Sequence, residues 1–444
     1  MKIPLPFLFP GTLLLASLAM LSPTVFGVNS PLPPPNYDES RVGSFTLPEA
    51  LRMADGSPVE TAQDWTRRRR PELLELYRQH VYGRTPQIQG PLEFRELDSR
   101  EDALGGTAVR KRVWITLKDR PAWKGLEVLL YVPRKRLGPV PCFVGLNFMG
   151  NHSTTRETDL PISSQWLEFR AQSGTPPRKG EPESPESSRG FQHGRWNPEA
   201  IVGAGCAVAT AYYGDLELDL PTGWTHGVRA ALSPQGAQTE WKPDDWGAIG
   251  AWAWGLSRIL DFLGTVPEVD SQKCAVIGHS RLGKAALWAG AQDERFSVVI
   301  SNNSGEGGAA LMRRQFGETV EVITARFPHW FAPRFKQYAR NEDACPVDQH
   351  LLIALCAPRP VAIGSAEEDR WADPTGEFLS GYHAGPVYGL FGKQGLASSE
   401  KPSVGTGATG DTISYHLRPG PHDINAEDWK EYLRFCKRHW NLQE

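Results

Sequence analysis

Short apolar runs alternate with stretches of helical periodicity along most of the chain. Apolar runs too short for helices are typical of buried strands, and they fall at residues 109–117, 126–132, 142–148, 206–213, 274–277, 298–301, 360–365 and 413–417. Apolar residues spaced as on one helix face occur at 71–81, 244–263, 282–291 and 428–440. This alternation predicts the α/β class, with one doubly wound, mostly parallel sheet and helices on both faces. We therefore expect functional loops at the carboxyl ends of the strands.

The first 27 residues have the pattern of a secretory signal peptide, with a basic residue ahead of an apolar run. Prolines interrupt the run, which disfavours a retained membrane span. Residues 28–444 are long enough for a single catalytic domain, which we expect to begin with an arm over about 28–60. A segment rich in Ser, Pro, Arg and Glu at about 151–198 is too long for a passive connection, so we expect it to be an insertion over the active site. The mature protein would be secreted or periplasmic.

Charge and cysteine content narrow the classes of partner. A formal net charge of −3 argues against a nucleic-acid partner, which needs a concentrated basic surface. The dense basic run at 67–70 is interpreted as a solvated helix face or as a helix start stopped by proline. The six cysteines lack the paired spacing of metal sites, and three in apolar runs are expected to be buried thiols: Cys142, Cys206 and Cys274. Export permits disulfides, for which the stronger candidates, with the pairing left open, are Cys345, Cys356 and Cys436.

A serine stands on a tight turn in the segment KCAVIGHSRLGKAALW at 273–288. A strand-like run leads into it, Gly278 and Gly283 flank it, and an Ala- and Leu-rich helix follows, which is the layout of a nucleophile elbow. An oxyanion formed at Ser280 would meet free backbone N–H groups and the positive end of the helix dipole, so ester or amide hydrolysis is indicated. Leu282 replaces the second glycine of the usual signature, and the alternative is a serine that caps an ordinary helix.

A serine nucleophile needs a histidine base, which is expected after the last strand. His422 in GPHDIN lies on a Pro- and Gly-rich loop at that place, ahead of the terminal helix. Its alternative role is to cap that helix. The other candidates are weaker because they lie inside a strand, in an aromatic run and at the start of an apolar helix: His416, His329 and His350.

The acid that orients the histidine should lie at a strand end between Ser280 and His422 in the chain. The loop SNNSGEGG after 298–301 offers Asn302, Asn303 and Glu306. The loop AEEDRWADP after 360–365 offers Glu367, Glu368 and Asp369. The second loop is favoured on charge, because an amide cannot balance an imidazolium. Its alternative interpretation is a solvated acidic turn.

The motifs GHSRLGKAA, SNNSGEGG, FGETV with FPHWF, RWADP and GPHDI, in this order, resemble those of the glucuronoyl esterases of carbohydrate esterase family 15, most closely the bacterial members. The resemblance covers most of the mature chain, including PELLELYRQHVYGRTP, GLNFMGNHS, RGFQHGRW and AYYGDLELD. It implies a secreted α/β-hydrolase that needs no metal or other cofactor. The implied substrate is the ester that joins a lignin alcohol to glucuronic or 4-O-methyl-glucuronic acid on xylan.

Carried over residue by residue, the resemblance implies Ser280 as nucleophile, His422 as base, and Arg281 as oxyanion stabiliser through its backbone N–H and its guanidinium. A guanidinium beside a developing negative charge is a stronger donor than a neutral amide. Three further residues match the family's contacts to the sugar: Lys284, Glu318 and Trp371. Without the resemblance they would be interpreted as a solvated helix lysine, a helix-capping acid and a core tryptophan.

The chain departs from the family pattern at Asn303, which stands where the triad acid usually lies. Some bacterial relatives carry an acid on the later loop instead, and Asp369 matches that location. We therefore predict a Ser280–His422–Asp369 triad, in a monomer that acts on glucuronoxylan or lignin–carbohydrate esters without a nucleic-acid or membrane partner. The alternatives are another carbohydrate esterase, such as an acetyl xylan esterase, and a carbohydrate-binding homologue of low activity, for which Asn303 is the motivating residue.

Overall fold

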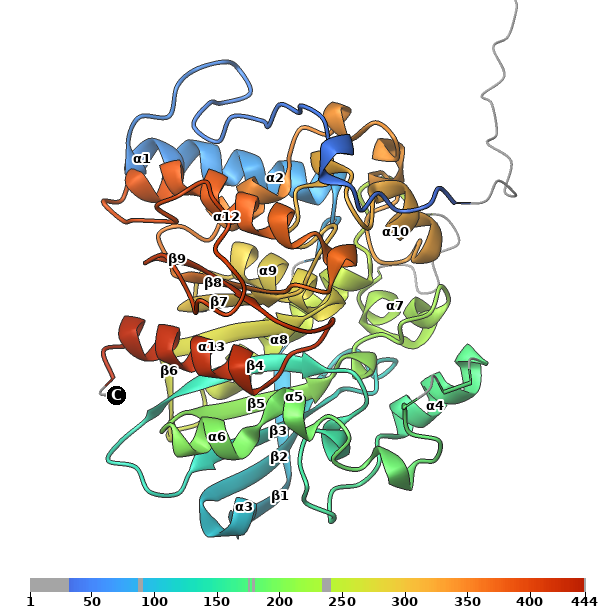
Figure 1. The fold of residues 1–444 in the computed structure, drawn as a ribbon. Helices are drawn as coiled ribbons and strands as arrows, with labels where there is room; N and C mark the ends of the chain where they lie inside the picture. Colours follow the sequence, from blue (N-terminus) through green and yellow to red (C-terminus); the bar gives the residue numbers. More distant parts are fainter. Residues whose placement is uncertain (1–31, 87–90, 175, 178–179, 234–240, 443–444) are drawn as a thin grey trace, which may run out of the picture. The chain divides into compact units, whose positions relative to one another are not determined.

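A nine-stranded sheet is the central element of the residues that the computed structural model describes (Figure 1). These residues are 32–86, 91–174, 176–177, 180–233 and 241–442, and Pro34–Glu444 is one compact unit. The signal peptide predicted at 1–27 lies outside the described residues, and the boundary at residue 28 stays a prediction.

The strand order in the sheet is β1-β2-β3-β5-β4-β6-β7-β8-β9. The bounds are β1 Leu92–Asp102, β2 Ala108–Leu117, β3 Leu126–Pro133, β4 Val140–Asn147, β5 Ala207–Tyr212, β6 Val269–His279, β7 Val298–Asn302, β8 Val361–Ala366 and β9 Ile413–Arg418. The pairs β5–β4, β4–β6, β6–β7, β7–β8 and β8–β9 are parallel. The pairs β1–β2, β2–β3 and β3–β5 are antiparallel. The predicted mostly parallel sheet is confirmed, with an antiparallel edge whose outermost strand, β1, was not predicted.

The four predicted helices are present as α2 Arg70–His80, α8 Ala248–Leu263, α9 Arg281–Gln292 and α13 Ala426–His439. Helix α8 begins at Ala248 rather than at 244, because Gly247 precedes it in extended backbone. The other α-helices are α1 Ala62–Asp64, α3 Ala103–Gly106, α4 Ser164–Ser173, α5 His193–Trp196, α6 Pro198–Gly203, α7 Val228–Leu232, α10 Val320–Arg326, α11 Gln349–Ala354 and α12 Pro374–Gly389. Helix α12, which follows the Asp369 loop, was not predicted.

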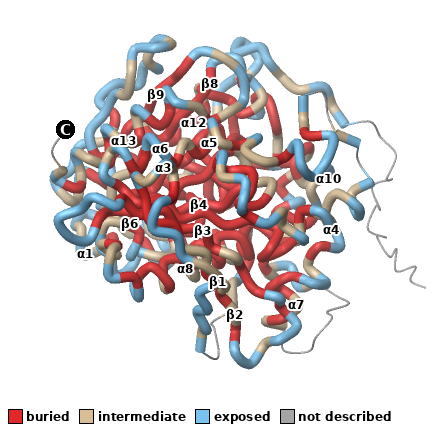
Figure 2. The backbone as a smooth tube through the Cα atoms, turned by 90° about the horizontal axis from the view of Figure 1, so that it is seen from below, coloured by how far each residue is buried: buried red, intermediate tan, exposed pale blue. Residues whose placement is uncertain are grey.

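The two faces of the sheet belong to two hydrophobic cores, because successive strand residues point to opposite sides. Val144 and Val276 lie in the larger core, to which α2, α8, α9, α11 and α12 contribute. Phe143 and Ile277 lie in the other, to which α6 and α13 contribute. Figure 2 shows the central strands β3, β4 and β6 as buried chain. The predicted helical layers on both faces are therefore confirmed.

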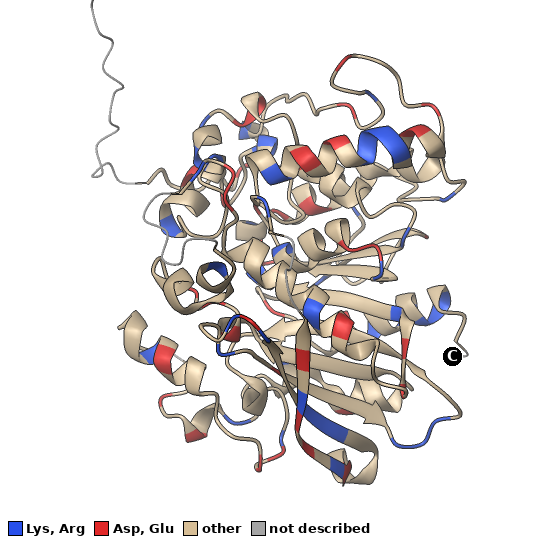
Figure 3. Ribbon diagram, turned by 180° about the vertical axis from the view of Figure 1, so that it is seen from behind, with Lys and Arg blue, Asp and Glu red and all other residues tan. Residues whose placement is uncertain are grey.

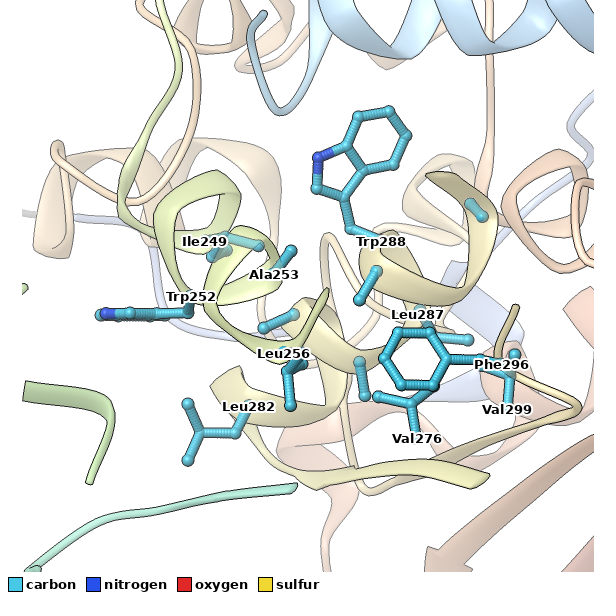
Figure 4. Packing of buried hydrophobic residues seen from close by; sticks show 14 of the residues in the cluster. Ile249, Trp252, Ala253, Leu256, Val276, Leu282, Leu287, Trp288, Phe296 and Val299 are labelled. Carbon is cyan, nitrogen blue, oxygen red and sulfur yellow. The ribbon is translucent and has the colours of Figure 1, made fainter. Parts of the chain in front are cut away.

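Helices α8 and α9 pack against each other in the larger core, with Ala253 of α8 on the side that faces α9 (Figure 4). Trp288 of α9 is fully buried and stacks on Tyr82, with ring centroids 4.7 Å apart. This packing leaves α9 little freedom, so the turn at its N-terminus is held in a fixed place.

The segment ahead of α1 contacts the loop that carries Trp371. The Arg370 guanidinium donates a hydrogen bond to the Tyr37 carbonyl oxygen. The Glu39 carboxylate lies 2.8 Å from the Arg314 guanidinium. The expected N-terminal arm therefore supports a loop at the carboxyl end of β8.

Two expectations about buried chemistry are corrected. All six cysteines are buried free thiols, so the expectation of disulfides at Cys345, Cys356 and Cys436 is wrong. For the run at 67–70, interpreted as a solvated helix face or a helix start stopped by proline, α2 does begin at Arg70 with Pro71 in its first turn, but Arg69 and Arg70 are buried rather than solvated. Their guanidinium groups donate to backbone carbonyl oxygens, such as that of Ala50 for Arg69 and that of Ala291 for Arg70.

The segment 151–198 lies between β4 and β5 and contains α4 and α5. Its placement over the active site stays a prediction. In Figure 3, acidic and basic residues are mixed along the elements, in keeping with the small net charge. None of the helices in the described part of the chain is long and apolar enough to cross a membrane.

Candidate active site

Ser280 occupies a strained turn between β6, which ends at His279, and α9, which begins at Arg281. Its backbone has φ 57° and ψ −130°, a conformation that L-residues rarely adopt. Its N–H donates to the Asn302 carbonyl oxygen at 2.9 Å, which ties the turn to β7. A Cβ at Gly278 would lie 2.0 Å from the Leu282 carbonyl oxygen, so the turn requires glycine there. The half-buried serine is thus presented at the carboxyl end of β6.

His422 and Asp369 form a hydrogen-bonded pair. His422 lies on the loop after β9, and its Nδ1 is 2.5 Å from Oδ2 of Asp369, which follows β8. The carboxylate is 4 % exposed and the imidazole 41 % exposed. A carboxylate can only accept, so Nδ1 carries the hydrogen and Nε2 is left as the basic nitrogen. This is the orientation that a general base needs.

The imidazole of His422 lies beside the turn at Ser280. Its ring centroid is 4.5 Å from that of His279, the residue directly before the serine. Burial and the nearby His422 hold the pKa of His279 well below its usual value, so His279 stays neutral. The described residues show no hydrogen bond from Ser280 to His422, a contact that commonly tightens only when substrate is bound.

Asp369 is the candidate acid that reaches the base. Asn303 is buried with φ 45°, and neither its amide nitrogen nor its amide oxygen has a partner among the described residues. The Glu306 carboxylate is buried and accepts from the Gly307 N–H, and burial raises its pKa well above the usual range. The two other candidate acids of the Asp369 loop, Glu367 and Glu368, are exposed. Among the described residues, no side chain of the loop after β7 is hydrogen-bonded to His422.

Arg281 combines two sources of positive potential beside the serine. As the first residue of α9, it lies where backbone N–H groups have no acceptor within the helix. Its guanidinium is 28 % exposed, donates to the Asp219 carboxylate and lies 4.9 Å from the Trp330 ring centroid. Backbone and side chain can both stabilise an anion formed at Ser280.

Lys284 and Glu318 lie together one helical turn beyond the serine. The Lys284 ammonium donates to the carbonyl oxygens of Ser304 and Glu306, at 2.5 and 2.6 Å. It is also 4.0 Å from the Glu318 carboxylate. Both side chains are buried, which lowers the pKa of Lys284 and raises that of Glu318. An ammonium has three donors, so one remains for a ligand.

Trp371 is connected to the same group through the backbone. Its carbonyl oxygen accepts from the Glu318 N–H at 3.0 Å, and its half-buried ring lies under the Arg326 guanidinium at 4.9 Å. The structure therefore brings the three predicted sugar contacts into one neighbourhood. It also shows that Lys284 holds the loop after β7, a role that the sequence did not indicate.

Two buried carboxylates near the site were not singled out from the sequence. Asp219 accepts hydrogen bonds from Arg281 and from His329, one of the weaker candidates for the base. Glu377 of α12 accepts from the N–H groups of Ser304 and Gly305, at 2.7 and 2.9 Å, and also from Ser365. Glu377 therefore ties the loop after β7 to the end of β8. Asp219 ends the motif AYYGDLELD, whereas nothing in the sequence around Glu377 marks it.

The site has the layout of a serine hydrolase. Among the described residues, no group of three or more His, Cys, Asp or Glu is placed to hold a metal ion. The candidate nucleophile, base, acid and oxyanion donors all come from the carboxyl ends of β6, β8 and β9 and from the start of α9.

Comparisons with known proteins give the same class of enzyme. Residues 241–392 match the family model described as glucuronyl esterase of fungi. A carbohydrate esterase from an unknown prokaryotic organism is 44 % identical over 404 residues, which are 91 % of this chain and 92 % of that protein. Among solved structures, a glucuronoyl esterase from Solibacter usitatus is 42 % identical with a TM-score of 0.84, covering 90 % of this chain and all of that one. A structure described as a promiscuous CE15 esterase from a marine bacterial metagenome is 44 % identical with a TM-score of 0.82, covering 91 % of this chain and all of that one.

We predict that Asp369→Asn lowers the turnover of an ester substrate by about four orders of magnitude, because the amide neither fixes the tautomer of His422 nor balances its charge. The matched control is Glu368→Gln, the exposed neighbour, which should turn over ester at close to the wild-type rate. Steady-state kinetics on the two purified variants decides. An Asp369→Asn rate within about tenfold of wild type would show that another acid, such as Glu306 or Glu368, orients the base.

Glu377 should make stability depend on pH. Burial raises its pKa from 4.5 to about 7, so the folded protein favours the neutral acid. The stability that this gives is complete below the ordinary pKa and is lost as pH rises through about 7. Glu377→Gln cannot ionise and retains an oxygen for the two N–H donors. The difference in free energy of unfolding between this variant and wild type should therefore shift in favour of the variant by on the order of 1–3 kcal/mol when the pH is raised from 5 to 8.

Urea unfolding at a series of pH values measures this difference, with the exposed Glu367→Gln as control. A difference between Glu377→Gln and wild type that stays constant from pH 5 to pH 8 would contradict the prediction.

Proposed function

The chain belongs to carbohydrate esterase family 15, the glucuronoyl esterases, and from that premise we propose how its active site works. The protein is a carboxylic ester hydrolase. It cleaves the ester that joins glucuronic or 4-O-methyl-glucuronic acid of glucuronoxylan to an alcohol, and the natural alcohol is that of a lignin unit. Ser280, His422 and Asp369 form the triad, and Arg281 stabilises the oxyanion.

The pairing of His422 with Asp369 is the observation that carries this proposal. It leaves Nε2 of the imidazole basic, places that ring beside the residue before Ser280, and supplies a buried negative charge for the imidazolium. A serine without such a pair would stay protonated and inert at neutral pH.

The cycle begins when His422 takes the proton of Ser280 as the serine oxygen attacks the ester carbonyl carbon. The resulting oxyanion is stabilised by the first N–H groups of α9 and by the Arg281 guanidinium. The imidazolium then protonates the departing alcohol, which leaves the uronate esterified to Ser280. A water molecule attacks this acyl-enzyme in the same way, His422 takes its proton, and the uronic acid and free serine are released.

Specificity comes from the acyl side. Lys284 has one N–H free of the two carbonyl oxygens it binds, and Glu318 beside it can accept from a sugar hydroxyl. Trp371 supplies an apolar face or an indole N–H. The alcohol side leaves the site after the first half-reaction, so we expect tolerance of varied alcohols.

We infer that the enzyme is exported, secreted or periplasmic, and acts as a monomer. The inference of export rests on the apolar, basic-headed stretch at 1–27. Six free buried thiols do not oppose it, because export permits disulfides without requiring them.

One observation favours a broader specificity as the second candidate. The structure described as a promiscuous CE15 esterase is 44 % identical to this chain, so other carbohydrate esters, acetyl esters included, are reasonable secondary substrates. The carbohydrate-binding alternative rested on Asn303, and Asp369 supplies the charge that Asn303 lacks.

We predict that the purified chain hydrolyses benzyl glucuronate with a higher kcat/KM than it hydrolyses a simple acetyl ester. Ser280→Ala should lose at least about four orders of magnitude in kcat, because no nucleophile remains. Product release is followed for both esters with both proteins. A preference for the acetyl ester would favour the broader esterase, and binding of glucuronoxylan fragments without any hydrolysis would favour the binding protein.

A further inference from the structure

Asp219 is a buried carboxylate beside the nucleophile that accepts four side-chain hydrogen bonds. It lies in the loop after β5, and its side chain is 2 % exposed. It accepts from the Arg281 guanidinium, from His329 Nε2 at 2.8 Å, from Trp330 Nε1 at 2.6 Å and from the Tyr213 hydroxyl at 3.3 Å. A buried carboxylate is tolerated only when its oxygens are satisfied in this way.

The donors around Asp219 keep it ionised. Burial alone would raise its pKa, but the Arg281 charge and the hydrogen bonds from His329 and Trp330 hold that pKa below the usual value. Asp219 therefore supplies a negative charge beside Arg281 at neutral pH.

Arg281 needs this anchor because an arginine side chain has many rotamers. Its guanidinium is 28 % exposed, so packing alone does not fix it. Asp219 takes one terminal nitrogen, while the Trp330 ring lies under the guanidinium at 4.9 Å and Phe327 lies at 5.6 Å. The Arg281 Nε is buried and has no partner among the described residues. Asp219 thus binds one edge of the guanidinium, and the other N–H groups remain available to the oxyanion.

We propose that Asp219 is a positioning residue for catalysis, which fixes the Arg281 guanidinium so that its remaining N–H donors meet the oxyanion formed at Ser280. The inference rests on the proposed function, in which Arg281 is an oxyanion donor. Trp330 serves the arrangement twice, since its N–H binds Asp219 and its ring supports the guanidinium. His329 serves it as a donor and is not a base.

Pre-organisation explains why a carboxylate can assist a site that must stabilise negative charge. An oxyanion donor acts without reorganisation only if it is already in place when the charge develops. The gain from a fixed guanidinium arises in the transition state, so losing it should lower kcat and leave KM nearly unchanged.

Asp215 offers a matched control on the same loop. It is also buried, and its carboxyl accepts from the Glu127 N–H, without a contact to Arg281 among the described residues. Burial raises its pKa well above the usual range. Asp215→Asn keeps the size of the side chain and an oxygen that can accept from the Glu127 N–H.

The test is steady-state kinetics on a uronate ester with Asp219→Asn, Arg281→Ala, the double variant and Asp215→Asn. Arg281→Ala should lose about 10²- to 10³-fold in kcat, as the loss of an oxyanion donor does. Asp219→Asn should lose about 10- to 100-fold with KM within about twofold of wild type. The double variant should be no slower than Arg281→Ala, because both changes remove the same interaction. Asp215→Asn should stay within about twofold of wild type.

Three results would overturn the proposal: losses that multiply in the double variant, an effect of Asp219→Asn confined to KM, or Asp219→Asn behaving like Asp215→Asn. A fully active Arg281→Ala is a different failure, because it removes Arg281 from the oxyanion site and so contradicts the proposed function itself. If Asp219→Asn does not fold, judged by thermal unfolding, Trp330→Phe replaces it. That variant loses one donor to Asp219 and keeps a ring, so kcat should fall about 3- to 10-fold in wild type and not at all in Arg281→Ala. An equal fall in both backgrounds overturns the proposal.

Discussion

Ser280 holds a backbone conformation, φ 57° and ψ −130°, that costs on the order of 1–3 kcal/mol, and the other parts of the active site are arranged around it. The conformation persists because β6 and α9 are both buried, and their packing fixes the two ends of the turn. The Asn302 carbonyl oxygen binds its N–H, and Gly278 allows the Leu282 carbonyl to approach. The same turn places the nucleophile and the first free N–H groups of α9 on one side. A relaxed turn would separate them.

Around this turn the charges are few, buried and paired. Arg281 is matched by Asp219, Lys284 by Glu318, and the imidazolium of His422 would be matched by Asp369. Each pair contains one partner that is almost inaccessible to water, so its interaction is screened little by salt. Glu377, by contrast, forms no ion pair among the described residues, and burial raises its pKa although the N–H groups of Ser304 and Gly305 act in the opposite direction. The site therefore contains three charged pairs and one unpaired carboxyl group, Glu377, whose neutral form is favoured by burial.

The sequence was sufficient for what depends on local pattern. The parallel strands, α9 and the Ser280 turn follow from apolar periodicity and glycine spacing. Strand β1 was missed because it is an edge strand with mostly exposed, charged residues. Helix α12 was missed because Pro386 and several glycines lower its intrinsic helix propensity, and burial of its apolar residues overrides that preference. Asp219 was missed because its partner Arg281 is far along the chain, and only the fold brings them together. The order of candidates for the acid could be argued from charge, but the contact of Asp369 with His422 depends on how the loops after β8 and β9 meet.

The central claim is that Asp369, from the loop after β8, orients His422, while the loop after β7 contributes no acid. The most direct test is the NMR signal of the His422 Nδ1 proton in ¹⁵N-histidine-labelled protein, assigned by its absence in His422→Gln. A short hydrogen bond to a carboxylate should give a strongly downfield proton in wild type. This signal should be lost in Asp369→Asn and retained in Asn303→Ala. If it survives in Asp369→Asn, a group other than Asp369 orients His422.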